Sequence, residues 1–179
     1  MIRLRARWRL APLLLVALLL TACGVAPSED ELLGRGGPTP QAVVESFLTS
    51  LNEALQADLT AATDRRAWAE RLASYFAPSE RADQRVVFAQ MLADYATSAA
   101  RPAYGSAIHT ELSYSGIELL ARDGDRATVR VVDGQVLLQW LDDEGEVVRE
   151  RTGALSALLD QTEGLPVVRV GGSWFMTEG

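Results

Sequence analysis

Cysteine and histidine are almost absent from this 179-residue chain, which contains one of each, Cys23 and His109, and no lysine. A single cysteine cannot form an intramolecular disulfide, so the fold has to be stabilised by its hydrophobic core. One histidine and one cysteine also cannot supply a structural zinc site or a three-histidine catalytic zinc site. The composition therefore excludes disulfide frameworks and zinc centres of these kinds.

Positive charge is concentrated at one end of the sequence. Four of the 17 basic residues, all arginine, lie within residues 1–9, and the chain from Cys23 onward contains the other 13 and all 24 acidic residues, a net charge of −11. Nucleic acids and anionic lipid surfaces both attract a basic protein face. The acidic excess therefore argues against nucleic acid, and against peripheral adhesion to anionic lipid.

Residues 1–22 have the pattern of a secretory signal. Four arginines within residues 3–9 precede an apolar run over residues 10–20, and small residues follow it. A helix needs about 20 apolar residues to cross the hydrocarbon core of a bilayer, and this run is shorter. We interpret it as an export signal and not as a permanent transmembrane helix.

The residues Leu20-Thr21-Ala22-Cys23 end this segment and resemble the lipobox of bacterial lipoproteins. The resemblance implies that the Cys23 thiol receives a diacylglyceryl group, that the chain is cut before it, and that the new amino group is acylated, for example with palmitate. Two or more acyl chains anchor a protein stably. The expected location is the extracytoplasmic face of a bacterial membrane, with the outer and inner membranes both open.

Two other interpretations of this segment exist. It is either an ordinary secretory peptide in which Cys23 is incidental, or a buried apolar helix of a cytosolic protein. Each requires the arginines, the run length and the cysteine position to coincide by chance, so we prefer the lipoprotein signal.

Cleavage before Cys23 would leave 157 residues, enough for one domain with a hydrophobic core. Residues 23–38 are rich in glycine, proline and charge, which predicts a flexible tether. The sequence therefore divides into a signal peptide over residues 1–22, a tether over residues 23–38 and a single domain over residues 39–179.

Helical periodicity predicts three helices at the start of this domain. The first begins with Thr39 as its cap, and its apolar positions recur at spacings of three and four. The second covers about residues 64–78, where a proline ends it. The third covers about residues 79–99. Its expected apolar face consists of Val86, Val87, Met91, Leu92 and Tyr95.

After residue 102 the apolar spacing changes to alternation, which predicts strands. The first strand begins at Ile108 and is expected to bend at a β-bulge at Gly116. Residues 154–159 are expected to form a short helix or an edge loop. Hairpin turns are predicted at residues 123–125, 142–145 and 171–172. This order predicts an α+β domain with three N-terminal helices packed on one face of a strongly curved antiparallel sheet.

The order of elements resembles the nuclear-transport-factor-2-like superfamily of cone-shaped α+β domains. The resemblance rests on the capped first helix TPQAVVESFLTSLNEAL, two shorter helices, a long bent strand and the closing hairpin VVRVGGSWFM. It covers about residues 39–177. It implies a fold and not a function, because members include isomerases, dehydratases, ligand binders and exported accessory domains. It also implies a homodimer through the outer face of the sheet, which such domains often form.

His109 and Asp94 have the best case for acid–base chemistry. By alternation, His109 falls on the polar face of its strand, which favours an exposed histidine over a catalytic base. In cone-shaped folds an acid that projects from a helix into the cavity can act as a base, but a lone acid beside an apolar stripe usually faces solvent. We therefore assign no catalytic residue, metal ligand or cofactor.

The aromatic residues have two interpretations. Packing between helices and sheet is the simpler one, and a pocket for an apolar ligand would use similar residues. The candidate pocket residues are Tyr75, Asp94, Tyr95, Tyr114 and Trp140.

Two functional hypotheses follow. The first is an exported lipoprotein, held to the membrane through Cys23, whose domain is a non-catalytic binding or assembly module for an unidentified protein or small apolar ligand. The second is a small-molecule enzyme or apolar-ligand carrier with a cavity near Asp94, Tyr95 and Tyr114. We favour the first, because no recognisable catalytic set accompanies a strong anchor signal.

Overall fold

The computed structural model describes residues 34–159 and 164–179, and these described residues form one compact unit. The lipobox and the signal peptide predicted over residues 1–22 lie outside the described residues. The unit has an α+β fold in which helices come first and antiparallel strands follow. Its first helices are α3 (Pro40–Gln56), α4 (Ala62–Ala73) and α5 (Arg81–Ala100), which confirms that three helices come first. The predicted end of the second helix at the proline is wrong, because α4 ends at Ala73.

Helix α3 begins as the sequence predicts. The hydroxyl of Thr39 accepts a hydrogen bond from the backbone N–H of Ala42 at 3.2 Å, and Pro40 occupies the first turn, where no intrahelical donor is needed. The helix buries an apolar stripe with the predicted spacing. Its buried residues include Val43, Val44, Phe47, Leu48, Leu51, Ala54 and Leu55.

The predicted apolar face of α5 is wrong in part. Val86 and Val87 are 67% and 54% exposed, whereas Phe88 is buried together with Gln84 and Leu92. The small and apolar residues of α5 are spread over several sides of the helix, so their periodicity does not define which side is buried. Packing against α4, and against Phe47 of α3, determines that side, and the buried positions lie four residues apart.

The strands form two antiparallel sheets rather than the single curved sheet that the sequence predicted. One sheet has the order β1-β4-β5 and the other has the order β2-β3-β6-β7, and the described strands close no barrel. The strands are β1 (Ala107–Ser113), β2 (Gly116–Asp123), β3 (Arg126–Val132), β4 (Gln135–Leu141), β5 (Val147–Ala154), β6 (Leu165–Val170) and β7 (Ser173–Met176). The short helix α6 (Leu155–Leu158) follows β5.

The long bent strand was predicted to have a bulge at Gly116, and this prediction is wrong. Gly116 is the first residue of β2, which belongs to a different sheet from β1, and the register shift lies further along, between Leu119 and Ala121. Between the two strands, Ser115 donates its backbone N–H to Val132 at 2.9 Å and its hydroxyl to the Asp133 carboxylate at 2.8 Å. The chain therefore crosses from one sheet to the other here.

The connection from β3 to β4 crosses between the sheets at the same place. Asp133 has a φ of 52°, and the next residue, Gly134, accepts a hydrogen bond from the N–H of Leu155 at 3.0 Å. A Cβ on Gly134 would lie 2.9 Å from the Leu155 side chain, which is fully buried. Both crossings are therefore attached to the start of α6.

The predicted hairpin turns are confirmed. Gly124, Gly145 and the pair Gly171-Gly172 all have positive φ, which glycine adopts without steric cost. Asp142 stabilises the acidic turn, because its carboxylate accepts hydrogen bonds from the backbone N–H groups of Glu144 and Glu146 at 3.1 and 2.8 Å.

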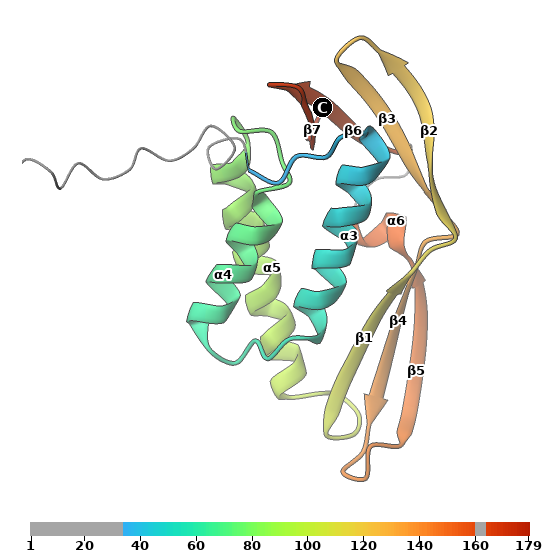
Figure 1. Ribbon diagram of the computed structural model, residues 1–179. Coiled ribbons are helices and arrows are strands. Elements are labelled where there is room, and N and C mark those ends of the chain that lie inside the picture. Colours follow the sequence, from blue (N-terminus) through green and yellow to red (C-terminus); the bar gives the residue numbers. More distant parts are fainter. Residues whose placement is uncertain (1–33, 160–163) are drawn as a thin grey trace, which may run out of the picture. The chain divides into compact units, whose positions relative to one another are not determined.

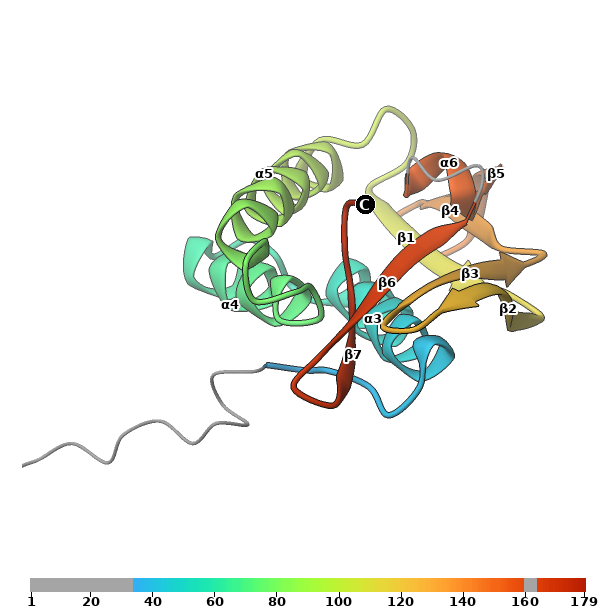
Figure 2. The same ribbon diagram turned by 90° about the horizontal axis from the view of Figure 1, so that it is seen from above.

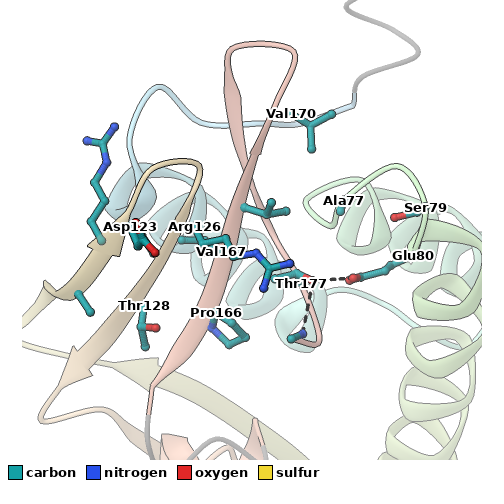
Figure 3. Close-up of a pocket in the computed structure, with 15 residues that line it drawn as sticks. Ala77, Ser79, Glu80, Asp123, Arg126, Thr128, Pro166, Val167, Val170 and Thr177 are labelled. Carbon is teal, nitrogen blue, oxygen red and sulfur yellow. Dashed lines mark hydrogen bonds between the residues drawn. The ribbon is translucent and has the colours of Figure 1, made fainter.

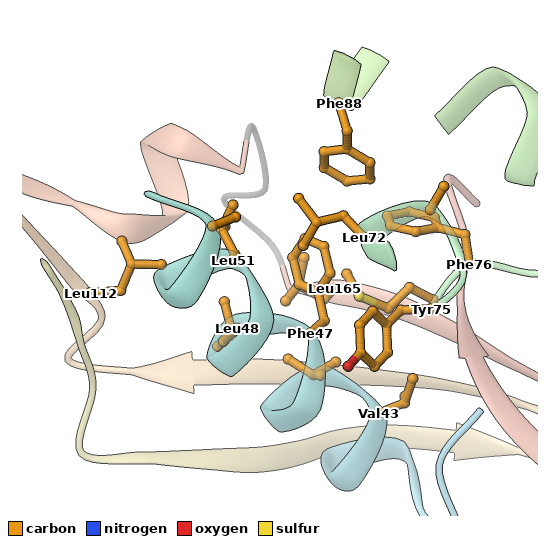
Figure 4. Packing of buried hydrophobic residues seen from close by; sticks show 14 of the residues in the cluster. Val43, Phe47, Leu48, Leu51, Leu72, Tyr75, Phe76, Phe88, Leu112 and Leu165 are labelled. Atoms are coloured by element: carbon orange, nitrogen blue, oxygen red, sulfur yellow. The ribbon is translucent and has the colours of Figure 1, made fainter. Parts of the chain in front are cut away.

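The core lies on both sides of α3, between the α4–α5 pair and the sheets (Figures 1 and 2). Phe47 is at its centre, with ring centroids 6.1 Å from Tyr75, 5.9 Å from Phe76 and 5.8 Å from Phe88 (Figure 4). On the opposite side of the core, Leu165 of β6 and Leu112 of β1 are buried with the same helix. Burying each large side chain contributes about 1.5–3 kcal/mol.

The domain begins earlier than the predicted boundary at residue 39. Gly37 is buried and exchanges two backbone hydrogen bonds of 2.8 Å with Trp174 of β7, and Arg35 donates its N–H to Ser74 at 2.9 Å. A Cβ on Gly37 would lie 2.6 Å from the backbone nitrogen of Val43. Close approach to α3, and not flexibility, therefore explains this glycine.

Replacing Phe47 with alanine tests the central position of α3. We expect Phe47→Ala to lower the free energy of unfolding by about 3–5 kcal/mol, since it removes a buried ring that three aromatic neighbours contact. Urea unfolding followed by tryptophan fluorescence measures the change. The matched control is Val86→Ala on the exposed side of α5, for which a change within about 0.5 kcal/mol is expected. Equal losses in both variants would contradict the packing described.

Candidate functional site

Tyr75 and Tyr95, two of the predicted pocket residues, have structural hydrogen bonds. The Tyr75 hydroxyl is buried and forms a 2.8 Å hydrogen bond with the hydroxyl of Ser50 on α3. The Tyr95 hydroxyl lies 2.9 Å from the carbonyl of Leu55 and 3.0 Å from the hydroxyl of Thr110 on β1. These two side chains therefore connect α3 to its neighbours.

Asp94 and Trp140 lie in two other environments. Asp94 is exposed on α5, where its carboxylate accepts a hydrogen bond from Gln90 at 2.9 Å. Trp140 is 9% exposed on β4 and packs edge-on against Tyr104, with 5.6 Å between ring centroids. The guanidinium of Arg149 lies 4.0 Å from the centre of the Tyr104 ring. The structure does not bring Asp94 and Trp140 together at one site.

Tyr114 lies between β1 and β2 and is half-buried. Burial raises the pKa of its phenol above 10, and the negative charge of Glu45 on α3 raises the pKa further, while hydrogen bonding to Thr49 acts in the opposite direction. The phenol is therefore held in its neutral form beside α3.

His109 lies on the face of the three-stranded sheet opposite to the core. Thr110 and Leu112 are buried, and strand alternation directs His109 the other way. It pairs with Gln139 of β4, whose side-chain amide donates a hydrogen bond to Glu150 of β5 at 2.8 Å. This row of three polar side chains lies on the outer face of that sheet, as the sequence predicts for His109.

A cavity lies on the outward side of the four-stranded sheet, and we call it the outer cavity. Ala127 and Val167 face each other across β3 and β6 and are buried in the core with α3. Their neighbours in each strand therefore point away from α3. A cavity of about 530 Å³ lies over this outward side (Figure 3). Its floor consists of two cross-strand pairs, Arg126 with Val168 and Thr128 with Pro166.

The wall of the outer cavity combines the connection between α4 and α5 with residues 177–179. Both oxygens of the Glu80 carboxylate accept hydrogen bonds there. One bond comes from the Thr177 hydroxyl at 2.5 Å (Figure 3), and the other comes from the backbone N–H of Glu178 at 3.0 Å. Thr177 also donates its backbone N–H to Pro166 at 3.1 Å. Glu80 thus holds residues 177–179 beside β6, and its acceptor atoms are already used.

Arg126 gives the outer cavity a cation. Its exposed side chain extends across β6 towards Thr177 (Figure 3). It forms no ion pair and no hydrogen bond with any other residue that the structure describes. By contrast, Arg130, four residues further along β3 and on the same side of that strand, is paired with Glu118 at 2.7 Å. The outer cavity therefore combines the apolar side chains of β6 with the Arg126 guanidinium. The lining also contains Arg122, whose guanidinium lies 5.0 Å from the centre of the Trp174 ring.

The outer cavity does not include the residues that the sequence singled out. Its lining contains none of Tyr75, Asp94, Tyr95, Tyr114 and Trp140. One signal was available, because alternation in β3 places Arg126, Thr128 and Arg130 on one side of that strand. The contribution of Glu80 and Thr177 had no sequence signal, since 97 positions separate the two residues.

Within residues 34–159 and 164–179, no cluster of three or more histidine, cysteine or acidic side chains is arranged to hold a metal ion. No helix in that part of the chain is both long and apolar enough to cross a bilayer. The sequence matches no family model and no curated protein.

A pH titration tests the environment of Tyr114. We expect its phenol to ionise above pH 10, and we expect Glu45→Gln to move the pKa back towards the ordinary value because it removes a neighbouring negative charge. Because the pKa of Tyr114 is higher in the folded protein than in the unfolded chain, this group contributes to folding stability. The contribution is complete below the pKa of about 10 in the unfolded chain, and it is lost as the pH rises through the pKa in the folded protein.

The ultraviolet difference spectrum between the parent and Tyr114→Phe isolates this transition. Glu118→Gln is the matched control, because Glu118 is paired with Arg130 on the outward side of β2. An equal pKa of Tyr114 in the parent and in Glu45→Gln would contradict the effect assigned to the Glu45 charge.

Proposed function

We propose that this protein is an exported lipoprotein, anchored through acylated Cys23 on the extracytoplasmic face of a bacterial membrane, whose domain is a non-catalytic binding or assembly module. The observation that carries the proposal is the lipobox pattern Leu20-Thr21-Ala22-Cys23, preceded by arginines and an apolar run of the length of an export signal. We assign the domain to the nuclear-transport-factor-2-like cone as part of the same proposal.

The arrangement of helices and sheets supports the fold assignment. Three helices precede two antiparallel sheets, and α3 lies between the helix pair and the strands, so the sheets curve around one helix. In a domain of this kind, function depends on which side chains line its cavities.

The positions of the candidate acid–base residues support a binding module over an enzyme. The Asp94 carboxylate is exposed and hydrogen-bonded to Gln90 on its own helix. His109 lies on the outer face of the three-stranded sheet, separated from α5 by that sheet. General acid–base catalysis needs such groups within hydrogen-bonding reach of a common substrate, and these two lie on different elements that face different ways.

The second candidate is an apolar-ligand carrier or small-molecule enzyme, and the outer cavity is the observation that favours it. Its volume of about 530 Å³ falls within the range of about 300–1,000 Å³ typical of small-molecule sites. It does not use the predicted region around Asp94, Tyr95 and Tyr114. A carrier function would therefore depend on other residues of the domain.

Acylation of Cys23 tests the anchoring proposal directly. Cells that express the parent protein and Cys23→Ser are fed an alkyne analogue of palmitate, and the label and the intact mass of the purified protein are measured. We expect the parent to be labelled and to start at Cys23, and we expect Cys23→Ser to lose the label and to leave the membrane fraction.

Ser28→Ala, in the predicted tether, is the matched control and should keep the label. An unlabelled parent, or Cys23→Ser that keeps its label, would contradict the proposal. Unlabelled Cys23→Ser that stays in the membrane fraction would contradict anchoring by acylation.

A further inference from the structure

We propose that the outer cavity binds a long-chain carboxylate. The carboxylate lies at Arg126, and the hydrocarbon chain lies along Pro166, Val168 and Val170 on the outward side of β6. The proposal names a ligand for the binding module proposed above. It rests on that proposed function in one respect only, because the lipid anchor is the reason for expecting the ligand to come from a membrane.

The lining of the outer cavity fits the apolar part of such a ligand. Pro166, Val168 and Val170 follow one another along the outward side of β6 and are each half-buried, and Ala77 contributes a buried methyl group from the opposite wall. Apolar surface that stays partly exposed gains free energy when a hydrocarbon chain covers it, at about 25 cal/mol per Å². The outward side of β6 therefore offers a continuous apolar strip to a hydrocarbon chain, beside the polar residues of the same lining.

The lining contains two arginines, Arg122 and Arg126, and two acids, Glu80 and Asp123, and among these groups Arg126 is the one that can bind a single anion. Arg126 extends over the floor without an ion pair among the described residues, and its guanidinium can hold a carboxylate through two parallel hydrogen bonds. Asp123, which pairs with Arg126 across the hairpin, lies beyond ion-pair distance of it. Glu80 accepts hydrogen bonds from Thr177 and Glu178 and forms no ion pair with Arg126 among the described residues.

The place of the outer cavity in the unit fits a ligand taken from a membrane. Gly34 is eleven positions after Cys23, so the chain between them spans at most about 40 Å even when extended. Arg35 bonds to Ser74, and the cavity wall begins three residues later, at Ala77. An acylated Cys23 would therefore keep Gly34, where the described part of the domain starts, within about 40 Å of the lipid anchor.

Photocrosslinking tests the proposal in isolated membranes that contain the full-length protein. The probe is a sixteen-carbon carboxylate with a diazirine near the end of its chain, and the crosslinked peptides are mapped by mass spectrometry. We expect labelling of β6 or of the connection between α4 and α5. We expect Arg126→Gln to lower the yield about tenfold, because it removes a charged hydrogen-bond donor.

Three comparisons make the result decisive. Arg130→Gln is the matched control on the same side of β3 and should label like the parent. The alcohol of the same chain length should label as weakly as Arg126→Gln does with the acid. Val168→Phe should reduce labelling by filling the floor, and thermal unfolding of each variant verifies that it is folded.

Other outcomes would overturn the proposal. It fails if the acid and the alcohol label equally, if Arg126→Gln labels like the parent, or if the crosslinks map to the residues around Tyr95 and Tyr114. A repeat with the purified full-length parent and Cys23→Ser proteins in detergent, where neither protein needs a membrane anchor, separates the two proposals. Labelling that persists without acylation supports the outer cavity even if the anchor is wrong, whereas the absence of labelling in both forms rejects the outer cavity alone.

Discussion

The burial of both sides of α3 is the constraint on which the rest of the structure depends. Phe47 contacts the aromatic residues of the helix pair, while Leu48 and Leu51 are buried in the same core as Leu112 and Leu165 of the two sheets. A single amphipathic stripe could cover one layer, but this helix is packed between two. The sheets must therefore separate and curve around it, which explains why the strands form two sheets.

Because the strands form two sheets, the chain has to cross from one sheet to the other. The same division leaves the outer cavity exposed. Ser115, Asp133 and Gly134 are held together where the chain crosses between the sheets, and Leu155 covers that point. With the core on one side of β3 and β6, the outward side of these strands is covered only where residues 177–179 and the connection between α4 and α5 reach it. The uncovered part between them is the outer cavity.

Much of the local structure could be predicted because it depends on neighbouring residues. Thr39 and Pro40 start a helix wherever they precede an amphipathic run, and glycines with positive φ make hairpin turns irrespective of the fold. The buried side of α5 could not be predicted, because Val86, Val87 and Phe88 are all apolar and only the position of α4 chooses among them. Gly116 was misjudged for a related reason, since a change of sheet and a bulge both reverse the alternation of a strand.

The sequence by itself determined the three helices, the hairpin turns, the polar face of His109 and the lipobox pattern at Cys23, because each of these depends on residues that are close together in the chain. Only the tertiary structure decided that there are two sheets, that residues 34–38 belong to the domain, and that Tyr75 and Tyr95 connect α3 to its neighbours instead of lining a pocket. It also decided the outer cavity, where Glu80 holds Thr177 across 97 positions beside Arg126. Contacts between such distant residues depend on how the helices and sheets pack, and no local pattern encodes that packing.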